Sequence, residues 1–179
     1  MGNNPNHCEV IGVVSILDDE HRLAYESLDV APHKRLAVPH LSYHLAGSYN
    51  WDGVIGCLDD LSASVAPFDI IADAVAIFES VPAIVYLTVS EPKALRELQA
   101  SIYERVAPHA HAPDEYYTPA RWVPHITIAS GIDPQEATRL AHSLRSKKIA
   151  WRIRIDNLAF MSVDHGNYVI SGRTKLLAR

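Results

Sequence analysis

The sequence predicts an α+β fold with two similar lobes, in which antiparallel sheets backed by helices enclose a central cleft. Three observations lead to this prediction. Two stretches, Pro39–Tyr43 and Pro124–Ile128, have the same order of Pro, His, an aliphatic residue, a hydroxyl residue and a bulky residue. Each lies within a strand–helix–strand–helix–strand succession. The chain of 179 residues, 48% of them hydrophobic, is sufficient for one core, so we expect a single domain, 1–179, with lobes from about 1–80 and 81–179.

The first half of the chain contains three expected strands and two expected helices. Val10–Leu17 is rich in Val and Ile, which is typical of a buried strand, and Asp18–Glu20 then opens a helix. The first motif strand follows at about 36–46. Asn50 is an expected N-cap, after which apolar residues recur at helical spacing, and Phe68–Phe78 is the third strand.

The second half repeats this order. Ala83–Val89 is a strand, and Pro92 suits the first position of a helix with one apolar stripe. The second motif strand follows around His125. The sequence Asp133-Pro134-Gln135-Glu136 then supplies an N-cap, a Pro at the first helical position and an acid in the first turn.

Two further segments complete the second half. Trp151–Val163 and Asn167–Leu177 alternate like strands and flank a hairpin turn at Asp164–Asn167. The connection Ala107–Arg121 contains three prolines and no periodicity, so we expect an irregular loop. Because this loop precedes the second motif strand, we expect it to border the cleft and to be more mobile than its neighbours.

The two motifs carry the chemistry. Side chains alternate between the faces of a strand, so His40 shares a face with Ser42, and His125 shares a face with Thr127. A pseudo-two-fold axis relating the motif strands would bring these four side chains together in the cleft. Two imidazoles suit general acid and base catalysis near neutral pH, and two hydroxyls can donate hydrogen bonds to phosphate oxygens. Neither motif contains Asp or Glu, so no metal is implied.

The paired signature, His40-Leu41-Ser42-Tyr43 and His125-Ile126-Thr127-Ile128, resembles that of the two-histidine phosphoesterases, specifically the 2′,5′-RNA ligase-like group. The resemblance covers nearly the whole chain in length, motif separation and element order. It implies a bilobal fold and hydrolysis, without metal or cofactor, of 2′,3′-cyclic or 2′,5′-linked phosphodiesters in small nucleotides or at RNA ends. It also implies that His40 is the proton donor and His125 the acceptor, with Ser42 and Thr127 holding the phosphate.

This sequence differs from that pattern at two points. It has Ser at the first hydroxyl position, and it carries His44, which strand alternation places on the same face as His40. We therefore include Tyr43, His44 and Arg121 as further candidates for the cleft, although an ordinary packed histidine is the alternative for His44.

Other functions stay open from the residues alone. A noncatalytic module that binds a nucleotide or an RNA end is the main alternative. His40 and His44 have a zinc-like spacing, but four residues of strand span about 13 Å, too far for one metal. His109 and His111 would suit a metal-dependent hydrolase. Tyr116-Tyr117 would either stack a base or pin the loop.

A basic stretch and the overall composition bear on partners and location. Six basic residues and no acid lie between Arg139 and Arg154, which fits either a rim for an RNA end or a helix C-terminus followed by an outward-facing strand. The net charge of −5 argues against wrapping a long nucleic acid. Only two cysteines, Cys8 and Cys57, and no signal or membrane segment predict a protein of the reducing cytoplasm. We further expect a monomer. Gly2 lacks the Ser or Thr that a myristoylation motif requires at position 6.

Overall fold

The computed structural model describes residues 9–164 and 167–178 and has the mixed α+β fold that the sequence predicts. Gly2, Cys8 and the centre of the expected hairpin turn at 164–167 lie outside the described residues. In chain order the strands and α-helices are β1 (Glu9–Ile16), α1 (Asp19–Glu26), β2 (His40–Tyr49), α2 (Trp51–Ser64), β3 (Phe68–Phe78), β4 (Ala83–Val89), α3 (Lys93–Val106), β5 (Ala110–Pro113), β6 (His125–Ile132), α4 (Pro134–Arg145), β7 (Trp151–Ile155), β8 (Asn157–Asp164) and β9 (Asn167–Lys175).

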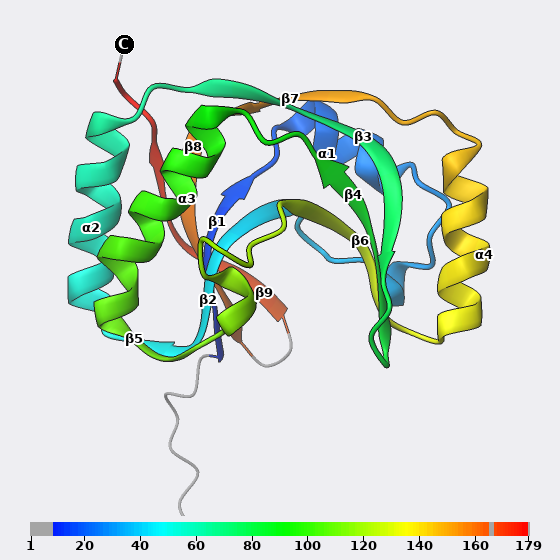
Figure 1. Cartoon of the computed structure of the whole chain (residues 1–179), viewed down its shortest axis with the longest axis horizontal. Helices are drawn as coiled ribbons and strands as arrows, with labels where there is room; N and C mark the ends of the chain where they lie inside the picture. The colour runs from blue at the N-terminus through cyan, green and yellow to red at the C-terminus, as the bar shows by residue number, and fades with distance from the viewer. Residues whose placement is uncertain (1–8, 165–166, 179) are drawn as a thin grey trace, which may run out of the picture.

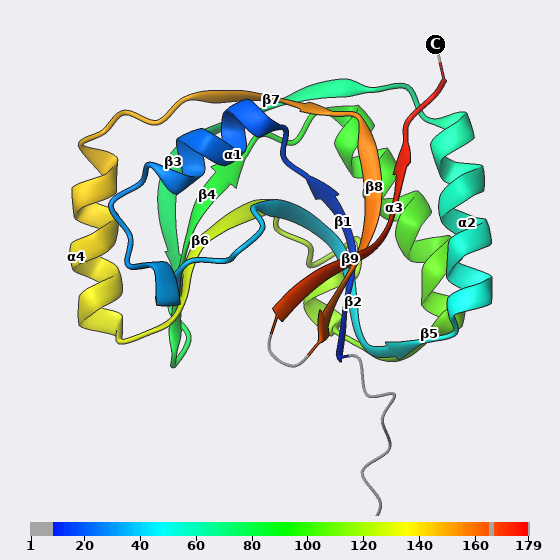
Figure 2. The ribbon, with the colours of Figure 1, turned by 180° about the vertical axis from the view of Figure 1, so that it is seen from behind.

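The strands form one curled antiparallel sheet. Its order is β7-β3-β4-β6-β2-β1-β8-β9, and β5 adds to the far end of β2. The sheet bends into an arch, with α4 at one end and α2 and α3 at the other (Figure 1). The view from behind shows the segment that leads from α4 into β7, which crosses the top of the arch (Figure 2). None of the helices in the described part of the chain is long and apolar enough to cross a membrane.

Each half of the sheet contains strands from both expected lobes, which divide the chain at about residue 80. Strands β1 and β2 pair with each other, but β1 also pairs with β8 from the end of the chain. In the other half of the sheet, β3 from the first part of the chain pairs with β4 and β7. The first part of the chain therefore gives β3 to the half of the sheet that contains β4 and β7, the second part gives β8 and β9 to the half that contains β1 and β2, and the two parts interlock.

The motif strands lie side by side at the centre of the arch. In the sheet Leu41 pairs with Ile126, and both of these side chains are fully buried. The helix behind β6 is α1, because the Tyr25 hydroxyl donates to the carbonyls of Thr127 and Ile128 at 3.1 and 3.2 Å. The helix behind β2 is α3, whose Gln99 donates to the Tyr43 carbonyl at 3.3 Å.

Two expected strands have different bounds in the structure. The first motif strand begins at His40 rather than near 36, because Pro39 has no N–H to give to a sheet. It continues past Gly47 to Tyr49, since β5 pairs with its end. The expected strand Trp151–Val163 is two strands, β7 and β8, which separate at Asp156 and pair with β3 and β1.

Asn157 explains where β8 begins. Its side-chain oxygen accepts from the Ile16 N–H at 3.0 Å, and its side-chain nitrogen donates to the Ile16 carbonyl at 2.9 Å. The residue is buried, so these bonds satisfy an amide that would otherwise be costly to bury. They anchor the first residue of β8 beside the end of β1.

Candidate active site

The pairing of β2 with β6 decides which side chains share a face. Leu41 and Ile126 point together into the core, so the residues on either side of them point the other way. Continuing this register sets His40 opposite Thr127 and Ser42 opposite His125. The two histidines are then diagonal neighbours, whose Cα atoms lie about 7–8 Å apart in an antiparallel pair.

The two imidazoles are held in the same way. Nδ1 of His40 lies 2.7 Å from the Val38 carbonyl, and Nδ1 of His125 lies 2.7 Å from the Val123 carbonyl. A carbonyl only accepts, so Nδ1 carries the proton in both rings and donates it. The Pro between each carbonyl and its histidine fixes the local backbone. Among the described residues, neither Nε2 has a hydrogen-bond partner.

Burial controls the charge of this pair. It lowers the pKa of His40 to about 4, against the hydrogen bond to Val38, and a charge on His125 lowers it further. Burial also lowers the pKa of His125, against its bond to Val123. Both rings are therefore neutral near pH 7 when the site is empty. A bound anion favours a protonated neighbour, so a phosphate would raise these pKa values.

The two hydroxyls have different surroundings. Ser42 is 8% exposed, whereas Thr127 is half-buried and pairs with Tyr86 of β4. The Trp122 indole N–H donates to the Ser42 carbonyl at 2.9 Å and so joins the segment before the second motif to the first motif strand. Sequence reasoning missed this role of Trp122. An indole donor directly before a motif was the available signal.

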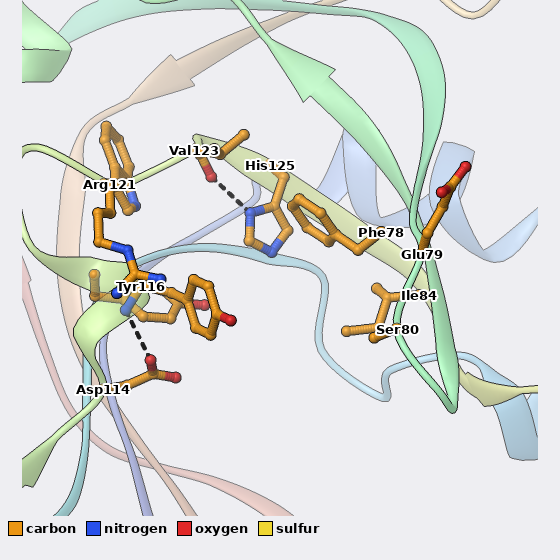
Figure 3. Close-up of a pocket in the computed structure, with 11 residues that line it drawn as sticks. Phe78, Glu79, Ser80, Ile84, Asp114, Tyr116, Arg121, Val123 and His125 are labelled. Carbon is orange, nitrogen blue, oxygen red and sulfur yellow. Dashed lines mark hydrogen bonds between the residues drawn. The ribbon is translucent and has the colours of Figure 1, made fainter.

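A cavity of about 400 Å³ opens beside His125. His40, Ser42 and Thr127 are not among its lining residues, so the cavity begins at the second motif (Figure 3). Phe78 stacks on Tyr86 with ring centroids 4.0 Å apart and meets the His125 ring edge-on at 5.0 Å. The residues that line it are Phe78, Glu79, Ser80, Ile84, Asp114, Tyr116, Tyr117, Arg121, Trp122, Val123 and His125.

The connection 107–121 borders this cavity, as predicted, through residues in its second half. The connection contains more regular secondary structure than expected. It has a 3₁₀ turn at Ala107–His109, strand β5 and a second 3₁₀ turn at Glu115–Tyr117. Its greater mobility stays a prediction. Arg121 lies on the cavity wall beside Tyr116 (Figure 3), with its guanidinium 4.5 Å from the centre of the Tyr116 ring. The same guanidinium lies 3.1 Å from a Glu115 carboxylate oxygen.

Two candidates for the cleft are wrong. Tyr43 is fully buried on the core side of β2, where its hydroxyl lies 2.8 Å from the Ser15 hydroxyl. His44 is also fully buried, because β2 has a bulge at Tyr43: Ser42 pairs with Val14, and His44 with the next residue of β1, Val13. The extra residue breaks the alternation and turns His44 to the opposite face from Ser42.

The surroundings of His109 and His111 indicate structural roles for both residues. The His109 ring lies against helix α2, where a Cβ on Gly53 would be 2.2 Å from its Nδ1, which explains a glycine inside that helix. His111 pairs with Ser48 across β5 and β2. Within 9–164 and 167–178, no three His, Cys, Asp or Glu side chains gather as a metal site would require.

The basic stretch is partly neutralised on the outer strands. Arg154 and Arg152 of β7 lie 3.1 and 3.7 Å from the Asp69 carboxylate on β3. Arg145 donates to the Val75 carbonyl at 3.0 Å. These three arginines therefore support the β3 side of the sheet and do not line the cavity beside His125.

Comparisons with known proteins agree with this fold. The model of the 2′-5′ RNA ligase superfamily matches residues 18–167. No curated protein gives a significant match. A crystal structure of a phosphoesterase is similar over 96% of this chain and 100% of its own, at 16% identity and a TM-score of 0.64.

Two crystal structures of Escherichia coli LigT are similar to a comparable degree. The complex with NADP⁺ shares 16% identity over 96% of this chain and 99% of its own, with a TM-score of 0.63. The complex with 3′-AMP shares 15% identity over 96% of this chain and 100% of its own, with a TM-score of 0.63. At these identities the similarity concerns the fold.

Proposed function

This chain belongs to the 2′-5′ RNA ligase superfamily, and from that premise we propose that it is a phosphodiesterase for 2′,3′-cyclic phosphates or 2′,5′-phosphodiester bonds. Its substrates would be small nucleotides or RNA ends. The observation that carries the proposal is the matched histidine pair: each ring donates Nδ1–H to its own motif carbonyl and keeps Nε2 for a ligand. Such a pair is suited to moving protons across one phosphate and needs no cofactor.

The proposed step on a cyclic phosphate is a hydrolysis. A neutral histidine takes a proton from water as the water oxygen bonds to phosphorus. The bond from phosphorus to the 2′ or 3′ oxygen breaks, and a protonated histidine gives that oxygen its proton. By family resemblance His40 is the donor and His125 the acceptor, while Ser42 and Thr127 hydrogen-bond the non-bridging oxygens. The product is a nucleoside monophosphate.

The cavity beside His125 would hold the nucleoside part of the substrate. Its volume of about 400 Å³ lies in the range of small-molecule sites, and aromatic rings form one wall. The LigT structures with 3′-AMP and NADP⁺ support a nucleotide in a relative of the same fold. The net charge of −5 favours a small nucleotide or an RNA end over a long duplex.

The alternative is a noncatalytic binding module. A module that holds phosphate by charge needs cations, yet Arg121 is the only Lys or Arg among the described residues that line the cavity. Two histidines with lowered pKa values are poor permanent cations but good proton carriers once an anion is bound. These features favour the enzyme.

The test is a panel of 2′,3′-cyclic nucleotides and 2′,5′-linked dinucleotides, assayed with and without EDTA. Wild type is compared with His40→Ala, His125→Ala and, as a control, His142→Ala, which removes an exposed imidazole from α4. We expect turnover that resists EDTA and requires the first two histidines. Nucleotide binding without turnover would favour the binding module, and loss of activity in EDTA would favour the metal-dependent hydrolase.

A further inference from the structure

Part of strand β2 is held by groups that lie outside the sheet. The strand pairs with β6 at Leu41 and with β5 from Ala46 onward. Between these two points three of its carbonyls accept hydrogen bonds from elsewhere in the chain: that of Ser42 from the Trp122 indole at 2.9 Å, that of Tyr43 from the Gln99 side chain at 3.3 Å, and that of Leu45 from the Asp114 N–H at 2.9 Å. The bond from Trp122 connects the two motifs, because Trp122 lies just before the second motif in the chain.

Two hydrogen bonds in series join Ser42 to the imidazole of His125. The first is the bond from the Trp122 indole to the Ser42 carbonyl, which is shielded from water because Trp122 is only 8% exposed. The second is the bond from Nδ1 of His125 to the carbonyl of Val123, the residue next to Trp122. Residues 122–124 lie outside the helices and strands, so the sheet itself does not place this carbonyl. The indole bond therefore fixes the segment that orients His125.

The first motif holds its histidine without such a bond. Ala37 stands where the second motif has Trp122, and its side chain has no donor. Backbone N–H groups hold this segment instead: that of Leu17 donates to the Pro39 carbonyl at 3.2 Å, and that of Leu36 donates to the Tyr25 hydroxyl at 3.2 Å. The Nδ1 bonds of the two histidines are alike, but the bonds behind them differ. Loss of the indole N–H should therefore displace His125 and leave His40 in place.

We propose that Trp122 is a positioning residue of the second motif, whose indole N–H holds the His125 imidazole in register with His40 and Ser42. An acid and a base that act on one phosphate must both lie within hydrogen-bond reach of the reacting oxygens. A fixed distance between the motifs supplies this condition before the substrate arrives. The inference rests on the proposed function for the identity of the reaction, and it adds the residue that sets the second histidine against the first.

The experiment removes the indole N–H and observes each histidine separately. Trp122→Phe keeps an aromatic ring on the cavity wall and beside Tyr43 but has no donor for the Ser42 carbonyl. In the nitrogen NMR spectrum of the imidazoles near neutral pH, wild type should show both rings with the proton on Nδ1. In the variant the His125 signals should move toward a mixture of tautomers, whereas those of His40 should stay unchanged.

Kinetics on a 2′,3′-cyclic nucleotide supply the second readout. We expect Trp122→Phe to lower kcat about 10-fold or more and to change KM much less, because misplacing a reacting group by about 1 Å costs up to roughly 100-fold in rate. A matched control is Trp151→Phe, which makes the same change on β7, outside the cavity. It should leave kcat and both histidine signals as in wild type.

A second variant separates positioning from folding. Benzothienylalanine at position 122 has the shape of tryptophan but carries sulfur in place of the N–H, so it should keep the Tm of wild type and show the same His125 and kcat changes as Trp122→Phe. An unchanged His125 tautomer in this variant, equal changes at His40 and His125, or a higher KM with wild-type kcat would overturn the inference. If wild type hydrolyses nothing in the panel but His125 alone responds, the proposed function fails and the positioning of His125 by Trp122 stands.

Discussion

The lowered pKa of His40 predicts an unusual pH dependence for the catalytic step. Burial holds this pKa at about 4, and burial lowers that of His125 as well. A mechanism with one acid and one base needs a single proton on the pair. In the free protein the state with that proton on His40 is therefore most populated well below pH 6.5, the ordinary value for histidine.

The size of the effect follows from the pKa. At pH 6.5 a group with a pKa of about 4 is protonated in roughly 0.3% of molecules, whereas an ordinary histidine would be half protonated. The logarithm of kcat/KM, which reports the free enzyme, should therefore rise by about one unit for each pH unit lowered from about 8 until the pKa of His125 is reached, which burial holds below 6.5. The bound phosphate raises the pKa values, so the maximum of kcat should lie at higher pH than that of kcat/KM.

The assay is steady-state kinetics on a cyclic nucleotide from about pH 4.5 to 9, a range that covers the ionisation of histidine. An imidazole NMR titration of the free protein accompanies it. Circular dichroism at each pH is the control, because His40 and His44 both have pKa values of about 4 in the folded state. Their unfolded forms bind protons from about pH 6.5 downward, so stability is complete above that pH and falls between 6.5 and 4. A kcat/KM break at or above pH 6.5, in folded protein, would refute the reasoning.

Three further predictions concern substitutions. His40→Ala and His125→Ala should each lower kcat/KM about 100-fold or more. The double variant should lose much less than the product of the two single losses, because the pair acts as a unit. Near wild-type rates in both single variants would contradict the mechanism. Thr127→Ala removes one hydrogen bond to the phosphate and should cost about 1–3 kcal/mol in kcat/KM, and an unchanged value would remove Thr127 from the site. Gly12→Ala should lower the free energy of unfolding measured in urea, since Gly12 has φ +143° and a Cβ would lie 1.9 Å from the His44 carbonyl; wild-type stability would mean that β1 shifts freely.

Much of the fold could be predicted because its elements carry local signals. The strands Phe68–Phe78 and Ala83–Val89 have the bounds expected from their apolar runs. Helix α4 begins as expected, with Asp133 accepting from the N–H groups of Gln135 and Glu136. The break at Asp156 was not visible, because alternation continues through it and only the choice of pairing partners separates β7 from β8. Partner choice is a long-range property that no local pattern encodes.

The site divides in the same way. The duplicated motif places His40 and His125 on adjacent strands, as the repeat predicts. The position of His44 could not be predicted, because a bulge at Tyr43 depends on how β1 pairs and reverses the face of every residue after it. Trp122 was equally hidden, since it bonds the Ser42 carbonyl across a distance in the chain that the motif does not span.

The interlocked topology explains how two short motifs come to lie on adjacent strands. The motif strands share a single pair, Leu41 with Ile126, so few sheet hydrogen bonds fix one histidine relative to the other. The backing helices come from opposite parts of the chain: α1 bonds β6 through Tyr25, and α3 bonds β2 through Gln99. The sheet is mixed in the same way: β3, from the first part of the chain, lies beside β4 and β7, and β8, from the second part, lies beside β1. The elements around the motif strands therefore fix the spacing of the two histidines, and the repeat by itself does not predict that spacing.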